Sequence, residues 1–334
     1  MRLLVCGGAG FIGSTFARQR LLEHGDRVTV LDKLTYAGRE ENLRDLSRES
    51  GFRFVRGAIE DGESVAAAIE GAEAIVNFAA ETHVDRSIAE PAAFVRTNAL
   101  GTYTLLEAAR ERELRYVQIS TDEVYGSIEE GSFTESSPLR PSSPYSASKA
   151  GADLLVESYF RTFGLPATIC RGSNNYGPYQ YPEKLIPLMV LNALHGERLP
   201  VYGDGLQVRN WLHVSDFVSA IGLVLEGGAA GEVYNVGGAE ECPNMEVVER
   251  IVELTGAGRE LIEHVRDRPG HDRRYSLSSS RVRELGWEPA VGMRQGLEQT
   301  VTWYRDNAWW WEPIRSGEYR AYYERQYGRA LVSE

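Results

Sequence analysis

Two short motifs in the middle of the chain carry side chains suited to proton transfer. Thr121-Asp122-Glu123 places two carboxylic acids side by side where an apolar run ends, and Tyr145 precedes Lys149 by one helical turn. This spacing puts the phenol and the ammonium on one face of a helix. An unperturbed phenol has a pKa of about 10, but a nearby cation favours the phenolate. Tyr145 is therefore a candidate base for a substrate hydroxyl, and Thr121 a candidate hydrogen-bond donor to the same oxygen.

A glycine-rich segment near the N-terminus predicts a dinucleotide site. Gly7-x-x-Gly10-x-x-Gly13 lies between an apolar strand and an amphipathic helix. Such glycines let backbone amides approach a diphosphate and let the helix pack closely on the strand. Asp32 follows about 20 residues later at the end of the second strand, where a carboxylate binds the adenosine ribose. The pattern favours NAD over NADP, while Lys33, beside Asp32, leaves NADP open.

Together these groups suit a reaction with three stages: oxidation of an alcohol, elimination of water next to the new carbonyl, and return of the hydride. A ketone acidifies the neighbouring C–H, so that a carboxylate such as Glu123 can remove the proton. Hydroxide leaves only with a proton, which Asp122 can supply if its surroundings keep it protonated. Because successive strand residues point to opposite faces, the backbone must leave strand geometry here for both acids to reach one substrate.

The elements that must position these residues alternate along the first half of the chain. Short apolar runs separated by helical patterns indicate an α/β fold with a doubly wound parallel sheet (Rossmann), joined by right-handed crossovers. Further strands are expected at 167–171 and 232–236. The first five strands are expected at 3–6, 27–31, 52–56, 74–78 and 116–120, with helices near 11–24, 64–70, 92–113 and 145–163.

The local composition of the sequence changes after Gly172, where turn-forming residues become frequent. We expect 1–172 to form the cofactor-binding domain with the catalytic residues. Residues 173–312 should form mainly a smaller mixed α/β lobe for the substrate, with some segments returning to the sheet. Residues 313–334 are a C-terminal extension without a predicted role. For Trp309–Trp311, packing of a helix end against the body is favoured over a ligand role.

Composition excludes several classes of protein. The chain has 334 residues, of which 43% are apolar and 25% charged, as in an ordinary globular protein. A net charge of −12 argues against nucleic-acid binding. The absence of a signal region or an apolar run of membrane length predicts no membrane association and a cytoplasmic location. Cys6, Cys170 and Cys242 are not spaced as disulfide partners or as metal ligands. No spacing of histidine, aspartate and glutamate residues indicates a metal site either.

The motifs also resemble those of a known family. The glycine loop, Tyr145-x-x-x-Lys149 and the Asn-Asn-Tyr-Gly-Pro run at 174–178 resemble the extended short-chain dehydrogenase/reductase superfamily. Within it, the run Ser-Thr-Asp-Glu-Val-Tyr-Gly at 120–126 resembles the dTDP-glucose 4,6-dehydratases, as do 79–87, 182–187 and 267–272. The resemblance covers about 1–312.

The resemblance implies conversion of dTDP-D-glucose to dTDP-4-keto-6-deoxy-D-glucose and water, a step of deoxysugar biosynthesis. C4 is oxidised, water is eliminated across C5 and C6, and the hydride returns to C6. In that family the residue matching Asp122 is the acid for the C6 hydroxyl, and the one matching Glu123 takes the C5 proton. It also implies a homodimer built on the helices near 92–113 and 145–163.

Further site residues are implied by matching positions. Lys184, Arg209 and Arg268 are candidates to clamp the diphosphate of the nucleotide sugar, since a net acidic protein needs a local basic cluster. The other substrate contacts implied are Glu81, His83, Asn174, Leu185, Pro200, Tyr202, Asn244 and His271. The cofactor contacts implied are Gly7, Gly10, Phe11, Ile12, Gly13, Asp32, Lys33, Leu34, Thr35, Ala79, Ala80, Thr97, Tyr145, Lys149 and Asn175.

Three alternatives remain open at this stage. A UDP-glucose 4,6-dehydratase carries a similar carboxylate motif, and thymidine differs from uridine by one methyl, worth only about 1–3 kcal/mol in an apolar pocket. A nucleotide-sugar 4-epimerase shares the fold, NAD and the Tyr–Lys pair but has no need of Asp122 and Glu123. An inactive dinucleotide-binding regulator that senses redox state is the third.

Overall fold

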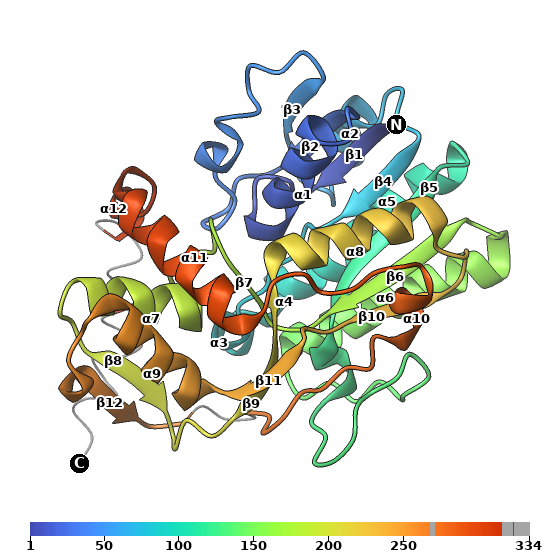
Figure 1. Cartoon of the computed structure of the whole chain (residues 1–334). Coiled ribbons are helices and arrows are strands. Elements are labelled where there is room, and N and C mark those ends of the chain that lie inside the picture. Colours follow the sequence, from blue (N-terminus) through green and yellow to red (C-terminus); the bar gives the residue numbers. More distant parts are fainter. Residues whose placement is uncertain (268–270, 316–322, 324–334) are drawn as a thin grey trace.

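The computed structural model describes residues 1–267, 271–315 and 323, and its core is a seven-stranded sheet (Figure 1). The strand order is β10-β6-β5-β4-β1-β2-β3, and every pairing is parallel. The predicted doubly wound α/β fold is confirmed. The strands are β1 (Arg2–Cys6), β2 (Arg27–Asp32), β3 (Phe52–Arg56), β4 (Ala74–Asn77), β5 (Arg115–Thr121), β6 (Ala167–Gly172) and β10 (Val233–Val236).

Helices cover both faces of this sheet. In β1, Leu3 and Val5 belong to the apolar cluster under α1 (Phe11–Leu22) and α8 (Val214–Gly227). Leu4 and Cys6 belong to the cluster on the opposite face. That face is covered by α2 (Gly62–Ala68), α5 (Thr102–Glu111) and α6 (Pro144–Phe163). Continuous apolar strands of this kind are typical of a sheet buried on both sides.

The helix expected near 92–113 is divided into three segments. A short α4 (Pro91–Phe94) leads into a π-helical segment, η2 (Val95–Gly101), and then into α5. In η2, Asn98 accepts a hydrogen bond from the Glu81 N–H (2.9 Å) and donates one to Ser148 Oγ (2.9 Å). The wide turn thereby fixes the loop after β4 to α6. Such turns are invisible to an apolar pattern and are frequent at functional sites.

A smaller lobe packs below one end of the sheet (Figure 1). It has a core of its own, separate from the two clusters of the large sheet. It contains a sheet of order β11-β9-β7 and a parallel pair, β12-β8, and is therefore mixed α/β as predicted. Its strands are β7 (Asn175–Tyr176), β8 (Leu199–Tyr202), β9 (Val208–His213), β11 (Glu240–Pro243) and β12 (Ile262–Val265), and its helices are α7 (Leu185–Leu194), α9 (Asn244–Thr255), α11 (Met293–Asp306) and α12 (Ala308–Arg315).

Segments of the second half of the chain return to the large sheet. β10 pairs with β6, and α8 packs against α1. The remaining short elements are the 3-10 turns η1 (Glu40–Leu43), η3 (Asp122–Tyr125) and η4 (Arg259–Leu261), and the helices α3 (Val84–Ala89) and α10 (Ser280–Glu284). None of the helices in the described ranges is long and apolar enough to cross a membrane.

The C-terminal helix α12 joins the lobe to the cofactor side of the molecule. Trp310 is 1% exposed, and its Nε1–H donates to Asn42 Oδ1 (2.6 Å). Its carbonyl accepts a hydrogen bond from Arg39 Nη1 (3.0 Å). Trp311 is also buried, whereas Trp309 is 41% exposed. The aromatic run thus packs a helix end against the body, as predicted for it.

We expect Trp310→Ala to lower the free energy of unfolding by about 3–5 kcal/mol, because it removes a buried indole and orphans a buried amide oxygen. Trp309→Ala, one residue away on the exposed side, is the matched control and should change it by less than about 0.5 kcal/mol. Urea unfolding followed by circular dichroism measures both. Equal losses in the two variants would contradict the packing described here.

Candidate active site

A cavity lies at the edge of the large sheet where its parallel strands end. It is lined by the loops after β1, β2, β4, β5 and β6, by the start of α6, and by a loop of the lobe. Ligands of open α/β sheets bind at this edge. The predicted site residues that line it are Gly7, Gly10, Phe11, Ile12, Gly13, Asp32, Lys33, Thr35, Ala79, Ala80, Glu81, Thr97, Thr121, Asp122, Glu123, Tyr145, Lys149, Asn174, Asn175 and Lys184.

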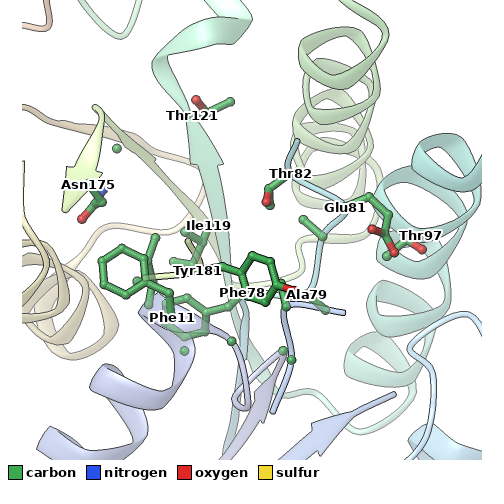
Figure 2. A pocket seen from close by; sticks show the side chains of 18 of the residues that line it. Phe11, Phe78, Ala79, Glu81, Thr82, Thr97, Ile119, Thr121, Asn175 and Tyr181 are labelled. Atoms are coloured by element: carbon green, nitrogen blue, oxygen red, sulfur yellow. The ribbon is translucent and has the colours of Figure 1, made fainter. Parts of the chain in front are cut away.

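Figure 2 shows how side chains from distant parts of the chain meet in this cavity. Glu81 and Thr97 lie side by side at one end, and Asn175 lies on the opposite side. Phe11 and Phe78 also line the cavity and are seen between these ends, so that the cavity has apolar surface between two polar ends.

The glycine loop leaves room for a ligand because side chains cannot occupy it. Gly7 has φ +72°, and a Cβ there would lie 2.5 Å from the Ala79 amide nitrogen. A Cβ at Gly13 would lie 2.3 Å from the Gly7 carbonyl oxygen. The start of α1 therefore approaches β1 and β4 as closely as backbone permits. This is the cradle that a dinucleotide diphosphate requires, so the residues present fit NAD.

Asp32 ends β2 at the position expected for a ribose contact. Its Oδ2 accepts a hydrogen bond from the Ala9 N–H (3.0 Å), and its Oδ1 accepts one from the Leu34 N–H (2.8 Å). Burial raises the pKa of Asp32, and these two backbone donors oppose that rise. Leu34 does not line the cavity; it has φ +57°, and its amide helps to fix the Asp32 carboxylate.

Lys33 is held by groups of the protein itself. Its Nζ donates to Thr97 Oγ1 (2.8 Å) and lies 3.3 Å from Glu60 Oε1 and 3.5 Å from Glu81 Oε1. Glu60 and Glu81 thus neutralise the Lys33 charge, which was the reason to consider NADP as the cofactor. The local charge beside Asp32 is negative, which disfavours a 2′-phosphate.

Helix α6 presents the phenol and the ammonium in its first two turns. Ser143 caps the helix by accepting a hydrogen bond from the Ser146 N–H (3.1 Å), so the first turn is fixed. Tyr145 and Lys149 are both buried, and Lys149 Nζ donates to the Ile119 carbonyl (2.6 Å). Both therefore face the end of β5, where the carboxylates lie.

The proton affinity of Tyr145 differs from the sequence-based expectation. Burial, followed by the negative charge of Glu123, raises the pKa of the phenol above its ordinary value, while a hydrogen bond with Thr121 lowers it. Lys149 was expected to bring this pKa down, but burial lowers the pKa of Lys149 itself to about 8. In the protein without ligands, burial and the neighbouring carboxylates therefore favour the protonated phenol.

The two carboxylic acids follow β5 directly. The strand ends at Thr121, and Asp122 and Glu123 begin the 3-10 turn η3. Both therefore line the same cavity, as the geometrical argument required. The Thr121 hydroxyl donates to Asp122 Oδ1 (3.2 Å) and accepts a hydrogen bond from the Glu123 N–H (3.3 Å).

Asp122 has the environment of an acid that keeps its proton. Burial, and then the charge of Glu123, raise its pKa to about 7, while Arg209 and the Thr121 hydroxyl act in the opposite direction. Its Oδ2 is buried and has no hydrogen-bond partner among the described residues. A buried carboxyl oxygen without a partner is costly, and such an atom in a ligand cavity marks a place for a substrate group.

Other predicted substrate residues form a second group in the lobe. His271 Nδ1 lies 2.6 Å from Asp267 Oδ1, and its ring stands edge-on to Tyr202. Gln207 donates to Asp267 Oδ2 (3.1 Å), and the Asn244 N–H donates to the Gln207 carbonyl (2.9 Å). His271, Tyr202 and Asn244 do not line the main cavity. Pro200 in β8 and Leu185 at the start of α7 do not line it either.

Three more predicted positions complete the set. Arg209 is 4% exposed, and its charge is felt by Asp122, so it lies close to the acid without lining the cavity. His83 precedes α3 and lies 4.0 Å from Glu183 Oε2. Arg268 lies outside the described residues.

Sequence reasoning missed a buried network that joins the cofactor side to the lobe. Tyr36 Oη donates to Glu183 Oε1 (2.8 Å), and Arg86 lies 3.3 Å from Glu183 Oε2 while stacking on the Tyr36 ring. Glu183 lines the cavity, as do Ser173 and Gln180. One signal for the cavity was present: only three of the 36 basic residues are lysines, and all three line it.

Comparison with known proteins agrees with this geometry. Residues 4–300 match the family model described as GDP-mannose 4,6 dehydratase. A dTDP-glucose 4,6-dehydratase of Streptomyces niveus is 56% identical over 323 residues, which are 95% of this chain and 96% of the relative. The crystal structure of the dTDP-glucose 4,6-dehydratase DesIV from Streptomyces venezuelae, solved with NAD bound, is 53% identical. It superposes with a TM-score of 0.92 over 94% of this chain and 100% of that one.

An epimerase is similar to a lesser degree. The UDP-glucose 4-epimerase of Thermus thermophilus is 34% identical, with a TM-score of 0.85 over 92% of this chain and 100% of the other. The fold is thus shared with epimerases, whereas the higher identity is with dehydratases. The chain belongs to the dTDP-glucose 4,6-dehydratase family of the extended short-chain dehydrogenase/reductase superfamily.

Proposed function

We propose that this protein is an NAD-dependent hydro-lyase that converts dTDP-D-glucose to dTDP-4-keto-6-deoxy-D-glucose and water, in deoxysugar biosynthesis. The observation that carries the proposal is Asp122: a buried carboxyl with a pKa of about 7 and one unpartnered oxygen. It stands beside Glu123 in the cavity that also contains Tyr145 and Lys149. A reaction without elimination has no use for a protonated acid and a second carboxylate at this place.

NAD, when bound, would supply the acceptor for the C4 hydride and the donor that reduces C6. The glycine loop would hold its diphosphate and Asp32 its adenosine ribose. The positive charge that accompanies the oxidised cofactor would favour the Tyr145 phenolate, opposing the desolvation that raises its pKa without ligands. Tyr145 then takes the C4 hydroxyl proton. Lys149 stabilises the phenolate before this transfer, and Thr121 orients the substrate oxygen.

The elimination belongs to the turn after β5. Once C4 is a ketone, Glu123 removes the acidified C5 proton, and Asp122 donates its proton to the departing C6 hydroxyl, so that water leaves. The Thr121 hydroxyl lies between the two acids and bonds to both, through the Asp122 side chain and the Glu123 backbone. Glu123 is then protonated and can return a proton to C5 when C6 has been reduced.

The nucleotide part of the substrate would bind between the cavity and the lobe. Lys184 lines the cavity, and Arg209 lies close to Asp122, so each can supply positive charge to a diphosphate. The group around His271 and Tyr202 would take the base and its sugar. Arg268 completes this proposed clamp from its position in the sequence.

Incubation with dTDP-glucose in deuterium oxide tests the function. We expect a 4-keto-6-deoxy product with one solvent deuterium at C5, because the C5 proton is lost to Glu123 and replaced from solvent. Turnover with UDP-glucose under the same conditions compares the two nucleobases. Clean conversion to the galactose epimer would show a 4-epimerase instead. Bound NAD without turnover across a panel of nucleotide sugars would indicate a redox-sensing regulator.

The pH dependence of elimination tests the role of Asp122. Its pKa of about 7 means that the donating form is present below pH 7 and is lost as the pH rises through that value. In single-turnover experiments we expect the elimination rate of the natural enzyme to fall above pH 7. Asp122→Asn cannot donate the proton and should be about 100- to 10,000-fold slower, without that fall. Unchanged elimination in the variant would remove Asp122 from this role.

We also propose that the protein works as a cytoplasmic homodimer. Large apolar side chains are exposed on η2, α5 and α6, among them Val95, Leu100, Tyr103, Leu154 and Phe163. These three helical segments pack on one another, and their symmetric pairing with a second copy would cover the exposed apolar side chains. The three cysteines are buried free thiols, in keeping with a reducing compartment. Light scattering should give twice the chain mass of 37.2 kDa; a monomer at micromolar concentration would refute the dimer.

A further inference from the structure

A buried ion pair lies next to the catalytic side chains and has no role in the chemistry above. Asp153 on α6 is 0% exposed and Arg171 on β6 is 1% exposed, and Arg171 Nε lies 2.8 Å from Asp153 Oδ2. Two charges removed from water cost so much free energy that apolar residues of the same size are often at least as stabilising. The presence of the pair therefore points to a purpose other than stability.

Hydrogen bonds tie the pair to both parts of the catalytic apparatus. The Ser120 hydroxyl, one residue before Thr121, donates to Asp153 Oδ2 (2.9 Å). On the other side, Arg171 Nη1 donates to Tyr125 Oη (2.8 Å), and Tyr125 lies in the turn that carries the two acids. Tyr125 in turn donates to Asn235 Oδ1 on β10 (2.9 Å). The pair thus links α6 to β5, to η3 and to the edge of the sheet.

Asp153 also lies one helical turn after Lys149, on the same face of α6. Burial disfavours the charged form of Lys149 and lowers its pKa to about 8, while the carboxylate of Asp153 acts in the opposite direction. A neutral lysine would not stabilise a phenolate at Tyr145. The charge of Lys149 at working pH accordingly depends on the carboxylate of Asp153.

We propose that Asp153 is a positioning residue of this enzyme that keeps Lys149 protonated, and that Arg171 holds the Asp153 carboxylate in place. The importance of this for catalysis rests on the function proposed above. The electrostatic coupling itself does not, because it can be measured without substrate.

Several other groups share this environment. Two neutral side chains lie on the elements packed against α6: Phe94 lies edge-on to Tyr145, and Asn98 donates to Ser148. The titratable and charged groups on the elements packed around Lys149 and Asp153 include Tyr145, Glu157 and Tyr159 on α6, Tyr103, Glu107 and Arg110 on α5, Arg115 and Tyr116 on β5, Asp122, Glu123 and Tyr125 on η3, Arg171 on β6, Asp85 and Arg86 on α3, and Arg96 on η2.

The small number of lysines makes a direct test possible. Enzyme labelled with 13Cε-lysine gives signals from Lys33, Lys149 and Lys184 alone, and Lys149→Arg assigns the signal of interest. We expect Asp153→Asn to lower the titration midpoint of Lys149 by about one pH unit or more, because an opposite charge is removed. The alkaline limb of the pH profile for C4 oxidation should move to lower pH by the same amount, and Asp153→Glu should restore both.

Glu157→Gln is the matched control. Its side chain is on the same helix, 25% exposed and 3.9 Å from Arg171 Nη2, so it removes a neighbouring acid without touching Lys149. Its Lys149 midpoint should equal that of the natural enzyme. If Asp153→Asn fails to fold because Arg171 is left unpaired, Asp153→Asn with Arg171→Gln removes both charges and should show the same shift.

Two results would overturn the proposal. One is a Lys149 midpoint in Asp153→Asn or in the double variant equal to that of the natural enzyme. The other is failure of both to fold, which would assign the pair to stability. A shifted midpoint in an enzyme that does not dehydrate dTDP-glucose would instead support the coupling and refute the proposed function.

Discussion

Removal of water from one small region controls the chemistry of this protein. Asp122, Tyr145 and Lys149 are all buried, and in each case burial is the largest cause of the pKa shift. Desolvation favours neutral forms, so it raises the pKa of acids and lowers that of the ammonium. The same physical effect therefore gives an acid that keeps its proton and a lysine close to losing its own. The resting phenol also stays protonated until positive charge arrives.

That region exists because of the sheet. In a parallel sheet every strand ends on the same edge, so residues far apart in sequence meet there. The glycine loop follows β1, Asp32 ends β2, Ala79 follows β4, and the acids follow β5. A 3-10 turn then places Asp122 and Glu123 on one side, where a continued strand would have separated them. The wide π-helical segment η2 serves the same end by fixing the loop after β4 to α6.

Prediction from sequence succeeded wherever a local pattern has only one structural meaning. The alternation of apolar runs and helices gave the sheet, and the Asp122–Glu123 pair required a break in the strand that the structure contains. The interruption at Asn98 could not be foreseen, because the apolar pattern through it is that of an ordinary helix. Nor could the protonated state of Tyr145, since desolvation depends on what other segments cover it. The Tyr36–Glu183 bond was missed for a similar reason: its partners are 147 residues apart.

The difference between lysine and arginine explains where each is used in this protein. Lys33, Lys149 and Lys184 line the cavity, while the other basic residues, apart from the histidines, are arginines. Arginine cannot lose its proton in a protein, whereas a buried lysine changes its pKa readily. The use of arginine at the buried structural position, Arg171, and lysine at the catalytic one follows from this difference. A permanent cation can anchor a carboxylate such as Asp153, and only a titratable one can have its charge adjusted by that carboxylate. The geometry of α6, which places the two a single turn apart, makes that adjustment available to the active site.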